Sequence, residues 1–171
     1  MGTEPVDCLN SFFDKQKENG DFTASLIFFN DTIESVYKNI NGKDVVRLKN
    51  EDYKPEGLTS LYDAIGFIID EHKEKKGVIA VILTDGLENS SKKYTSSEIK
   101  KSITIMEKEN NWKFIYLAAN QDSFAVGEQI GINTTCNYEY TVDGFRNIMR
   151  TLSDNVSRCI SLEIDKKDLK F

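Results

Sequence analysis

The sequence has few of the residues that build disulfide frameworks and thiolate metal centres. It holds three cysteines, Cys8, Cys136 and Cys159, and one histidine, His72, and no two cysteines form a Cys-x-x-Cys pair. This odd, widely spaced set argues against a disulfide framework and against a zinc centre. Reduced thiols are the rule in the cytoplasm, so we expect a cytoplasmic protein. His72 falls at the end of a predicted helix, away from the sheet edge where a ligand would bind. No Ser-His-Asp catalytic site is therefore expected.

The chain also lacks an excess of positive charge, a long apolar run and the common nucleotide-binding motifs. Its 22 Lys and Arg residues stand against 28 Asp and Glu residues, for a formal net charge of −6. A basic nucleic-acid surface is therefore not expected. No run approaches the roughly 20 apolar residues of a membrane-spanning helix, and no secretory leader is evident. Neither Gly-x-Gly-x-x-Gly nor Gly-x-x-x-x-Gly-Lys-Ser/Thr occurs. We expect neither nucleic acid nor a membrane among the partners.

The most informative segment is residues 77–86, GVIAVILTDG. Its unbroken apolar run predicts a strand buried on both faces of a parallel sheet. The strand leads into Asp85, and in open α/β sheets the ligand crevice lies outside the carboxyl ends of the strands. A plainer alternative is that Asp85 and Gly86 form a turn. The strand alone does not decide between a ligand-binding carboxylate and a turn.

A second segment, residues 57–66, GLTSLYDAIG, precedes this strand. From Leu61 onward its apolar residues recur at helical spacing, which predicts a helix packed on a sheet. Thr59 and Ser60 then fall in the entry loop or at the helix N-cap, where either hydroxyl could act as a cap. Alternatively, a loop hydroxyl and the Asp85 carboxylate are both hard oxygen donors, which suit Mg²⁺ or Mn²⁺.

The remaining segments alternate between helix and strand patterns, which is typical of an α/β fold. We predict a first helix over 4–19, an antiparallel hairpin that turns at 30–31, and a helix from a Thr95/Glu98 capping box to about residue 110. Strands follow over 113–119 and 134–140, with a helix over 121–130 between them and a last helix through Cys159. We expect one doubly wound, mostly parallel sheet with an antiparallel edge strand and helices on both faces. Residues 1–160 are predicted to form a single domain, followed by a charged C-terminal tail over 161–171.

The block Gly-x-Thr-x-Leu-x-x-Ala-Ile at 57–65, followed by the apolar strand ending Leu-Thr-Asp-Gly at 83–86, resembles the von Willebrand factor A (vWA) domain. The resemblance runs from about residue 6 to about residue 160. It implies a Rossmann-like doubly wound sheet whose upper edge carries a metal-ion-dependent adhesion site. By this resemblance, Thr59 matches the metal-site threonine and Asp85 the metal-site aspartate, while Ser60, Glu88 and Asn89 would contact the partner.

The sequence departs from this family at its start. The remaining metal ligands of a vWA domain come from an Asp-x-Ser-x-Ser motif after the first strand, and no such motif occurs here. Met1 matches a methionine that follows this motif in many members. We therefore expect an N-terminally truncated domain that lacks the first strand and three ligands, either because the gene start is placed too late or because the natural copy is short. A different strand filling the gap is a third alternative.

The resemblance implies a protein-binding module rather than an enzyme, so we assign no catalytic residues. The implied cofactor is Mg²⁺ or Mn²⁺, held weakly or not at all by Thr59 and Asp85. The implied partner is a protein that reaches the metal with an acidic side chain. Two alternatives remain: a metal-assisted hydrolase or phosphoryl-transfer enzyme on a similar sheet, and a truncated fragment without function.

Overall fold

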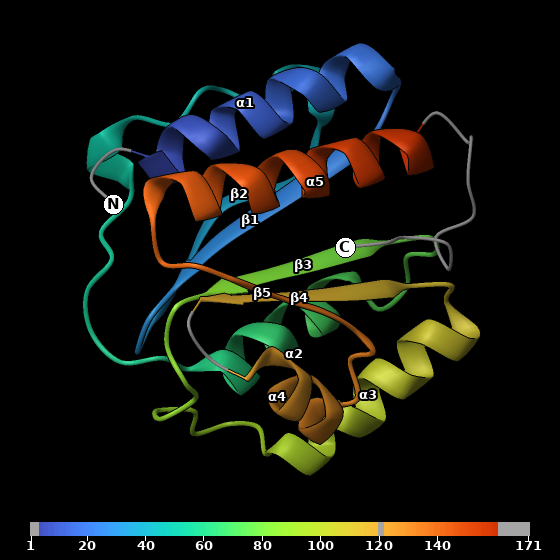
Figure 1. Ribbon diagram of the computed structural model, residues 1–171. Helices are drawn as coiled ribbons and strands as arrows, with labels where there is room; N and C mark the ends of the chain where they lie inside the picture. The colour runs from blue at the N-terminus through green and yellow to red at the C-terminus, as the bar shows by residue number, and fades with distance from the viewer. Residues whose placement is uncertain (1–3, 120–121, 161–171) are drawn as a thin grey trace. The chain divides into compact units, whose positions relative to one another are not determined.

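We describe the fold from a computed structural model, which defines residues 4–119 and 122–160. Helices and strands alternate along the chain, as the sequence predicts (Figure 1). The elements are α1 (Glu4–Asn19), β1 (Thr23–Phe29), β2 (Ile33–Asn41), η1 (Gly42–Asp44), η2 (Asn50–Asp52), α2 (Leu61–His72), β3 (Ile79–Thr84), α3 (Ser96–Glu109), β4 (Lys113–Ala119), α4 (Ser123–Ile130), β5 (Thr134–Tyr138) and α5 (Val142–Ile160).

The chain divides into two compact units. Within the described residues, unit 1 comprises 4–28, 34–56 and 139–160, and unit 2 comprises 29–33 and 57–138 without 120–121. The single domain over 1–160 stays a prediction, and the tail over 161–171 lies outside the described residues. No helix in the described part of the chain is long and apolar enough to cross a membrane.

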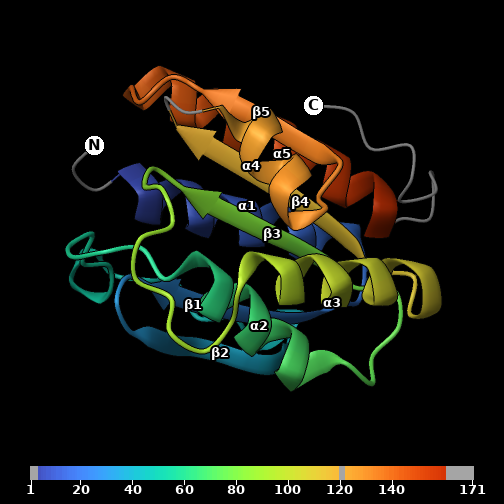
Figure 2. The ribbon, with the colours of Figure 1, turned by 90° about the horizontal axis from the view of Figure 1, so that it is seen from below.

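Unit 2 is built on a three-stranded parallel sheet in the order β3-β4-β5. Ile79 of β3 lies opposite Lys113 of β4, and Ile115 of β4 lies opposite Thr134 of β5. Helices α2, α3 and α4 lie on one face of this sheet (Figures 1 and 2). Their apolar faces and the inward side chains of β3 and β4 form one core, which includes Leu61, Ile65, Ile99, Ile103, Phe114, Tyr116, Ile130 and Ile132.

The prediction for β3 is only partly correct. The strand forms where expected, but within the described part of the chain it pairs with β4 alone and so lies at an edge of its sheet. Three of its six residues are half-buried, and Val81 is 36% exposed. The strand that is buried along almost its whole length is β4, which has a partner on each side. A continuous apolar run predicts burial on both faces of a strand. It does not show whether the strand has a hydrogen-bonded neighbour on each of its two edges.

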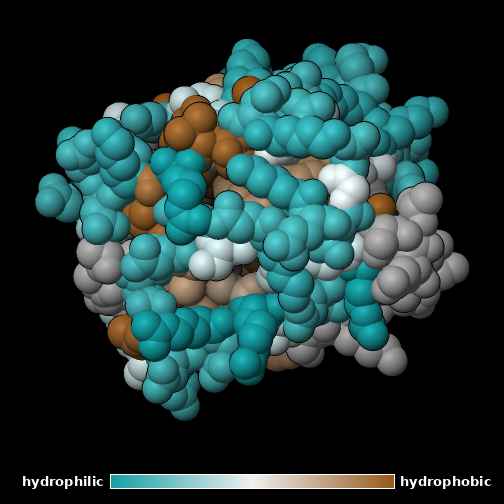
Figure 3. Space-filling view, turned by 90° about the horizontal axis from the view of Figure 1, so that it is seen from above, coloured by the Kyte–Doolittle hydropathy of each residue, from teal (hydrophilic) through white to brown (hydrophobic). Residues whose placement is uncertain are grey.

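Unit 1 contains the helices α1 and α5 and most of the β1-β2 hairpin. The hairpin turns between Phe29 and Ile33 as predicted, but it forms a two-stranded antiparallel sheet of its own. The expected antiparallel edge strand of a mostly parallel sheet is therefore a separate hairpin. Phe13 of α1 packs with Ala24 and Val45 in a small core. Figure 3 shows the face over α1 and α5 as mostly hydrophilic, with hydrophobic side chains in small separate patches.

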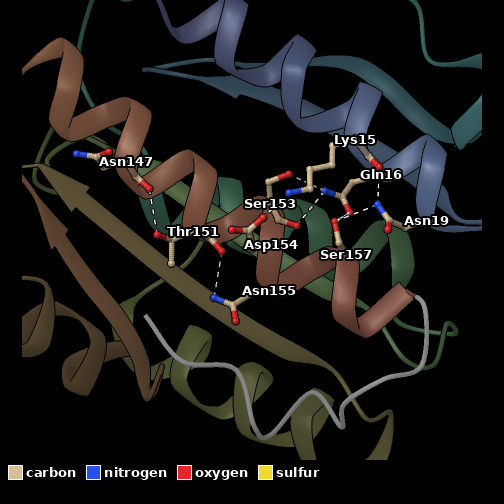
Figure 4. Close-up of polar contacts among 9 residues, drawn as sticks. All are labelled: Lys15, Gln16, Asn19, Asn147, Thr151, Ser153, Asp154, Asn155 and Ser157. Atoms are coloured by element: carbon tan, nitrogen blue, oxygen red, sulfur yellow. Dashed lines mark hydrogen bonds and ion pairs between the residues drawn. The ribbon is translucent and has the colours of Figure 1, made fainter.

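The helices α1 and α5 lie side by side, and a row of buried and half-buried polar side chains joins them (Figure 4). Gln16 donates from Nε2 to the Ser153 carbonyl (3.2 Å) and hydroxyl (2.9 Å), and its Oε1 accepts from the Ser157 hydroxyl (3.1 Å). Asn19 donates to the same Ser157 oxygen at 3.2 Å. We call Gln16, Asn19, Ser153 and Ser157 the polar seam. Gln16 is 1% exposed, so the seam supplies the hydrogen bonds that water would otherwise make to its buried side-chain amide.

Candidate functional site

The two segments that the sequence singles out come into contact at the carboxyl end of β3. Thr59 lies in the loop before α2, and its hydroxyl lies so close to Gly86 that a Cβ at that position would collide with it. Gly86 follows Asp85 directly. The threonine that resembles a vWA metal ligand therefore contacts the residue directly after the matching aspartate, and this close approach requires glycine at position 86.

Backbone and side-chain hydrogen bonds hold this loop pair in place. Asn89 Oδ1 accepts from the Thr59 backbone N–H at 2.8 Å, and the Asn89 backbone N–H donates to the Thr59 carbonyl at 3.0 Å. On the β3 side, Thr84 Oγ1 accepts from the Gly86 backbone N–H at 3.1 Å. Asn89, expected to contact the partner, thus orients Thr59, and its own side chain stays exposed.

The hairpin turn, residues 29–33 of unit 2, also contacts the loop that carries Thr59. The Asn30 carbonyl accepts two hydrogen bonds from Ser60, one from its backbone N–H (2.8 Å) and one from its hydroxyl (2.5 Å). Ser60 is only 3% exposed, so its hydroxyl faces the fold rather than the solvent. Next to it, Asp31 Oδ1 would lie 3.0 Å from a Cβ on Gly57, whose φ of +96° suits glycine. Asp31 therefore lies against the segment that carries Thr59.

Glu88 organises the start of α2 instead of pointing away from the protein. Its carboxylate accepts hydrogen bonds from the backbone N–H groups of Tyr62 (3.1 Å), Ser90 (3.0 Å) and Ser91 (2.8 Å). The Ser91 hydroxyl donates to the same carboxylate at 2.6 Å. An acidic group at a helix N-terminus is favoured by the unpaired N–H groups and by the helix dipole. The partner-binding role expected of Glu88 stays a prediction.

Asp63 is a second carboxylate with a structural role, which the sequence pattern did not single out. It accepts hydrogen bonds from the backbone N–H groups of Lys92 (2.9 Å), Lys93 (3.0 Å) and Tyr94 (2.9 Å). Burial raises the pKa of Asp63, but these three backbone donors outweigh it and hold the pKa below its ordinary value of 3.8. The Asp63 side chain thereby ties the loop after Glu88 to the first turn of α2.

Asp31 and Asp85 differ from these two carboxylates. Both are exposed, and neither has a hydrogen bond or ion pair with another residue in the described part of the chain. Two exposed apolar side chains lie on the two loops of the site: Leu58, which precedes Thr59, is 54% exposed, and Leu87, which follows Gly86, is 60% exposed. We call Asp31, Leu58, Thr59, Asp85 and Leu87 the acidic edge. It combines two unneutralised charges with two large exposed aliphatic groups.

The acidic edge does not supply enough ligands for a resident metal ion. Mg²⁺ demands near-octahedral oxygen coordination and is commonly held by one or two carboxylates with several waters. Among residues 4–119 and 122–160, no three His, Cys, Asp or Glu side chains are grouped so that they could hold an ion. The acidic edge offers at most the Thr59 hydroxyl and the carboxylates of Asp31 and Asp85, so an ion bound there would keep several of its waters. We expect such an ion to be held weakly.

The geometry gives no support to a hydrolase. His72 is 8% exposed at the C-terminal end of α2, whereas Thr59 precedes the N-terminal end of the same helix. Twelve helical residues span about 18 Å, so this histidine cannot act on a group bound beside Asp85. Asp122, another carboxylate after a predicted strand, caps α4 by accepting from the Ala125 N–H at 3.0 Å. That bond is ordinary capping chemistry.

The comparisons with known proteins concern the fold. Neither a protein-family model nor a curated protein matches the sequence. Among solved structures, the chain is similar to proximal thread matrix protein 1 from the mussel byssus, a protein that contains vWA domains, with a TM-score of 0.60 and 14% sequence identity. The match covers 88% of this chain and 40% of that one. At this identity the likeness shows the fold alone, so what the chain has is a vWA-like α/β fold.

Proposed function

We propose that this chain is a protein-binding module that recognises its partner through the acidic edge, without catalysis. The observation that carries the proposal is the close approach of the Thr59 hydroxyl to Gly86, beside Asp85. It brings the two motif residues together at the carboxyl ends of the strands, where α/β folds bind their ligands. The similar structure is that of a matrix protein, which agrees with an interaction role.

The edge has the composition of a small interaction surface. Exposed apolar groups mark interaction sites when they occur together, and Leu58 and Leu87 flank the site on its two loops. The loops behind them are fixed by the hydrogen bonds of Asn89, Ser60 and Glu88. A partner would therefore meet a preformed surface and would pay little entropy for ordering it.

We further infer that Mg²⁺ or Mn²⁺ binds this chain weakly or not at all, because Thr59 and Asp85 provide two donors. A calorimetric titration of the purified chain with Mn²⁺ tests this inference. We expect no saturable heat at millimolar metal. Tight, stoichiometric binding that Asp85→Ala abolishes would show that the edge holds an ion after all. A cytoplasmic location is also part of the proposal, and it is compatible with the three cysteines, Cys8, Cys136 and Cys159, which form no disulfide bond in the described part of the chain.

Selection from a random peptide display library against the folded chain tests the binding function itself. The variants Asp85→Ala and Leu87→Ser remove one charge and one apolar group from the acidic edge, and both positions are exposed. Asp143→Ala on α5 and Ile105→Ser on α3 are matched controls, because their side chains are also exposed. We expect the selected peptides to lose binding to the edge variants and to keep binding to the controls. Peptides that bind all four variants equally would place recognition elsewhere.

A further inference from the structure

The side of β3 that faces away from β4 is a strand edge without a partner in the described part of the chain. β3 pairs in parallel with β4 along all six of its residues, and β4 in turn pairs with β5. The order β3-β4-β5 therefore leaves the outer side of β3 at the end of the sheet. Along such an edge, alternate backbone N–H and C=O groups point outward and can pair with a further strand.

The composition of β3 is unusual for an edge strand. Natural edge strands are commonly protected by charged side chains, by proline or by short length. In the hairpin, β2 carries the exposed charges of Glu34 and Lys38, and β5, the other edge strand of the parallel sheet, is only five residues long. β3, with the sequence IAVILT, has no charged residue, no proline and no glycine. Its outer edge thus has the composition of a strand with a neighbour on each side.

We propose that the outer edge of β3 binds an extended apolar segment of another protein, which pairs with Ile79–Thr84 and adds a strand to the sheet. In this mode of recognition, main-chain hydrogen bonds provide affinity, and the side chains of the added strand provide selectivity. The inference goes beyond the proposed function, because the surface is the backbone of β3 and not the side chains of the acidic edge.

The burial of β3 favours a single strand as the occupant over a second copy of this chain. Val81 is 36% exposed, whereas Ile79, Ala80 and Leu83 are half-buried and Ile82 is buried. A second copy would have to bring its own sheet and the helices on that sheet to this edge, which requires a widely exposed strand. An added peptide strand needs only the spacing of one strand, about 4.8 Å.

The side chains of β3 also indicate what the occupant carries. Successive residues of a strand point to opposite faces of the sheet. Ala80 and Ile82 belong to the apolar core on the helix-covered face, so Ile79, Val81 and Leu83 point to the other face. Because both faces are apolar at β3, apolar side chains on both faces of the added strand would pack against it. We therefore expect consecutive apolar residues in the partner segment rather than an alternation of apolar and polar residues.

Selection of random displayed peptides against the folded chain, with counter-selection against Val81→Lys, isolates ligands of this edge. A lysine on an edge strand opposes pairing, so a synthetic peptide of the enriched sequence should bind Val81→Lys about tenfold more weakly than wild type. Ile105→Lys is the matched control, since Ile105 on α3 is also exposed, and it should leave the affinity unchanged. Urea denaturation shows whether both variants keep the stability of the wild type.

Two measurements on the same peptide separate strand addition from side-chain docking. Backbone amide hydrogen exchange within residues 79–84 should slow when the peptide binds. N-methylation of the peptide, one position at a time, should weaken binding at every second residue, because alternate backbone N–H groups of the added strand point toward β3.

Four other outcomes would overturn the inference. A selection without enrichment would show that the edge binds no extended segment, and peptides that Ile105→Lys weakens equally would respond only to net charge. Peptides without slowed exchange or a two-residue period would bind through side chains. A concentration-dependent dimer that Val81→Lys dissociates would make a second copy the occupant. The proposed function is tested separately, by Asp85→Ala and Leu87→Ser, and stands or falls independently of these results.

Discussion

Polar side chains are buried in both units, but their partners differ. In unit 1, the seam residues of α1 and α5 hydrogen-bond to one another. Both the amide nitrogen and the amide oxygen of Gln16 have a partner there. In unit 2, the hydroxyls of Tyr116, Ser123 and Thr135 are buried without a hydrogen-bond partner in the described residues. The core around them is otherwise apolar. Unit 1 is therefore expected to depend on specific polar pairing, and unit 2 on apolar packing.

The strongest test of this difference is a cavity in the core of unit 2. Phe114 is 1% exposed and packs against Trp112 with the ring centroids 5.6 Å apart. Replacing Phe114 by alanine removes this burial and leaves a void, so we expect the free energy of unfolding to fall by about 3–5 kcal/mol. Urea denaturation measures the change. Phe124→Ala on α4 is the matched control, since Phe124 is 67% exposed, and it should alter stability by less than about 0.5 kcal/mol.

The second test removes the central residue of the polar seam. Gln16→Ala leaves the Ser153 and Ser157 hydroxyls without their buried partner, and we expect a loss of about 1–3 kcal/mol. The exposed Gln129 gives a matched variant, Gln129→Ala, that should be close to neutral. A variant with Gln16→Leu, Ser153→Ala and Ser157→Ala removes Gln16 together with both of its hydroxyl partners, while Asn19 keeps its bond to the Lys15 carbonyl, and it should recover most of the loss. If the triple variant were less stable than Gln16→Ala, the seam would stabilise the fold by more than the hydrogen bonding of its own polar groups.

The sequence predicted the elements of both units but not this difference between them. The last helix was predicted to run through Cys159, and the structure confirms it as α5, with Phe145, Ile148 and Leu152 on its buried face. The capping box of Thr95 and Glu98 is also confirmed, because local backbone geometry decides it. The seam was missed, since polar residues at helical spacing normally indicate a solvent-facing side.

The same limit applies to the candidate site. Thr59 and Asp85 could be found from their motifs, but the carboxylates that organise the surrounding loops have no local signal. The tertiary fold brings the Tyr62 N–H to Glu88 and the Lys92 N–H to Asp63 across 26 and 29 residues of sequence. Likewise, the edge position of β3 depends on its neighbours and not on its own residues. Motifs thus identified the residues of the site, whereas their roles required the structure.

The third test concerns Asp63, whose carboxylate ties the loop after Glu88 to the first turn of α2. Asp63→Asn loses the charge that three backbone donors stabilise, and we expect a cost of about 1 kcal/mol at neutral pH. Because the folded state lowers the pKa of Asp63 below 3.8, its stabilisation is present above that pH and is lost as the pH falls through the folded-state value. The difference between wild type and variant should therefore shrink in acid. Asp85→Asn, which loses no hydrogen bond to a described residue, is the control and should change the stability at neutral pH by less than about 0.5 kcal/mol.

The smallest expected effect is a gain in stability rather than a loss, and it contrasts the two units most directly. Burial, followed by the nearby Tyr62, raises the pKa of Tyr116 to about 12, and its hydroxyl has no partner in the described residues. Tyr116→Phe removes an unsatisfied polar atom, so we expect stability to stay equal or to rise by up to about 1 kcal/mol. Tyr94→Phe, which loses a hydrogen bond of 2.5 Å to Asp70, should instead lower it slightly. A clear loss in Tyr116→Phe would show that this hydroxyl is satisfied, for example by a buried water, and that unit 2 uses polar pairing as unit 1 does.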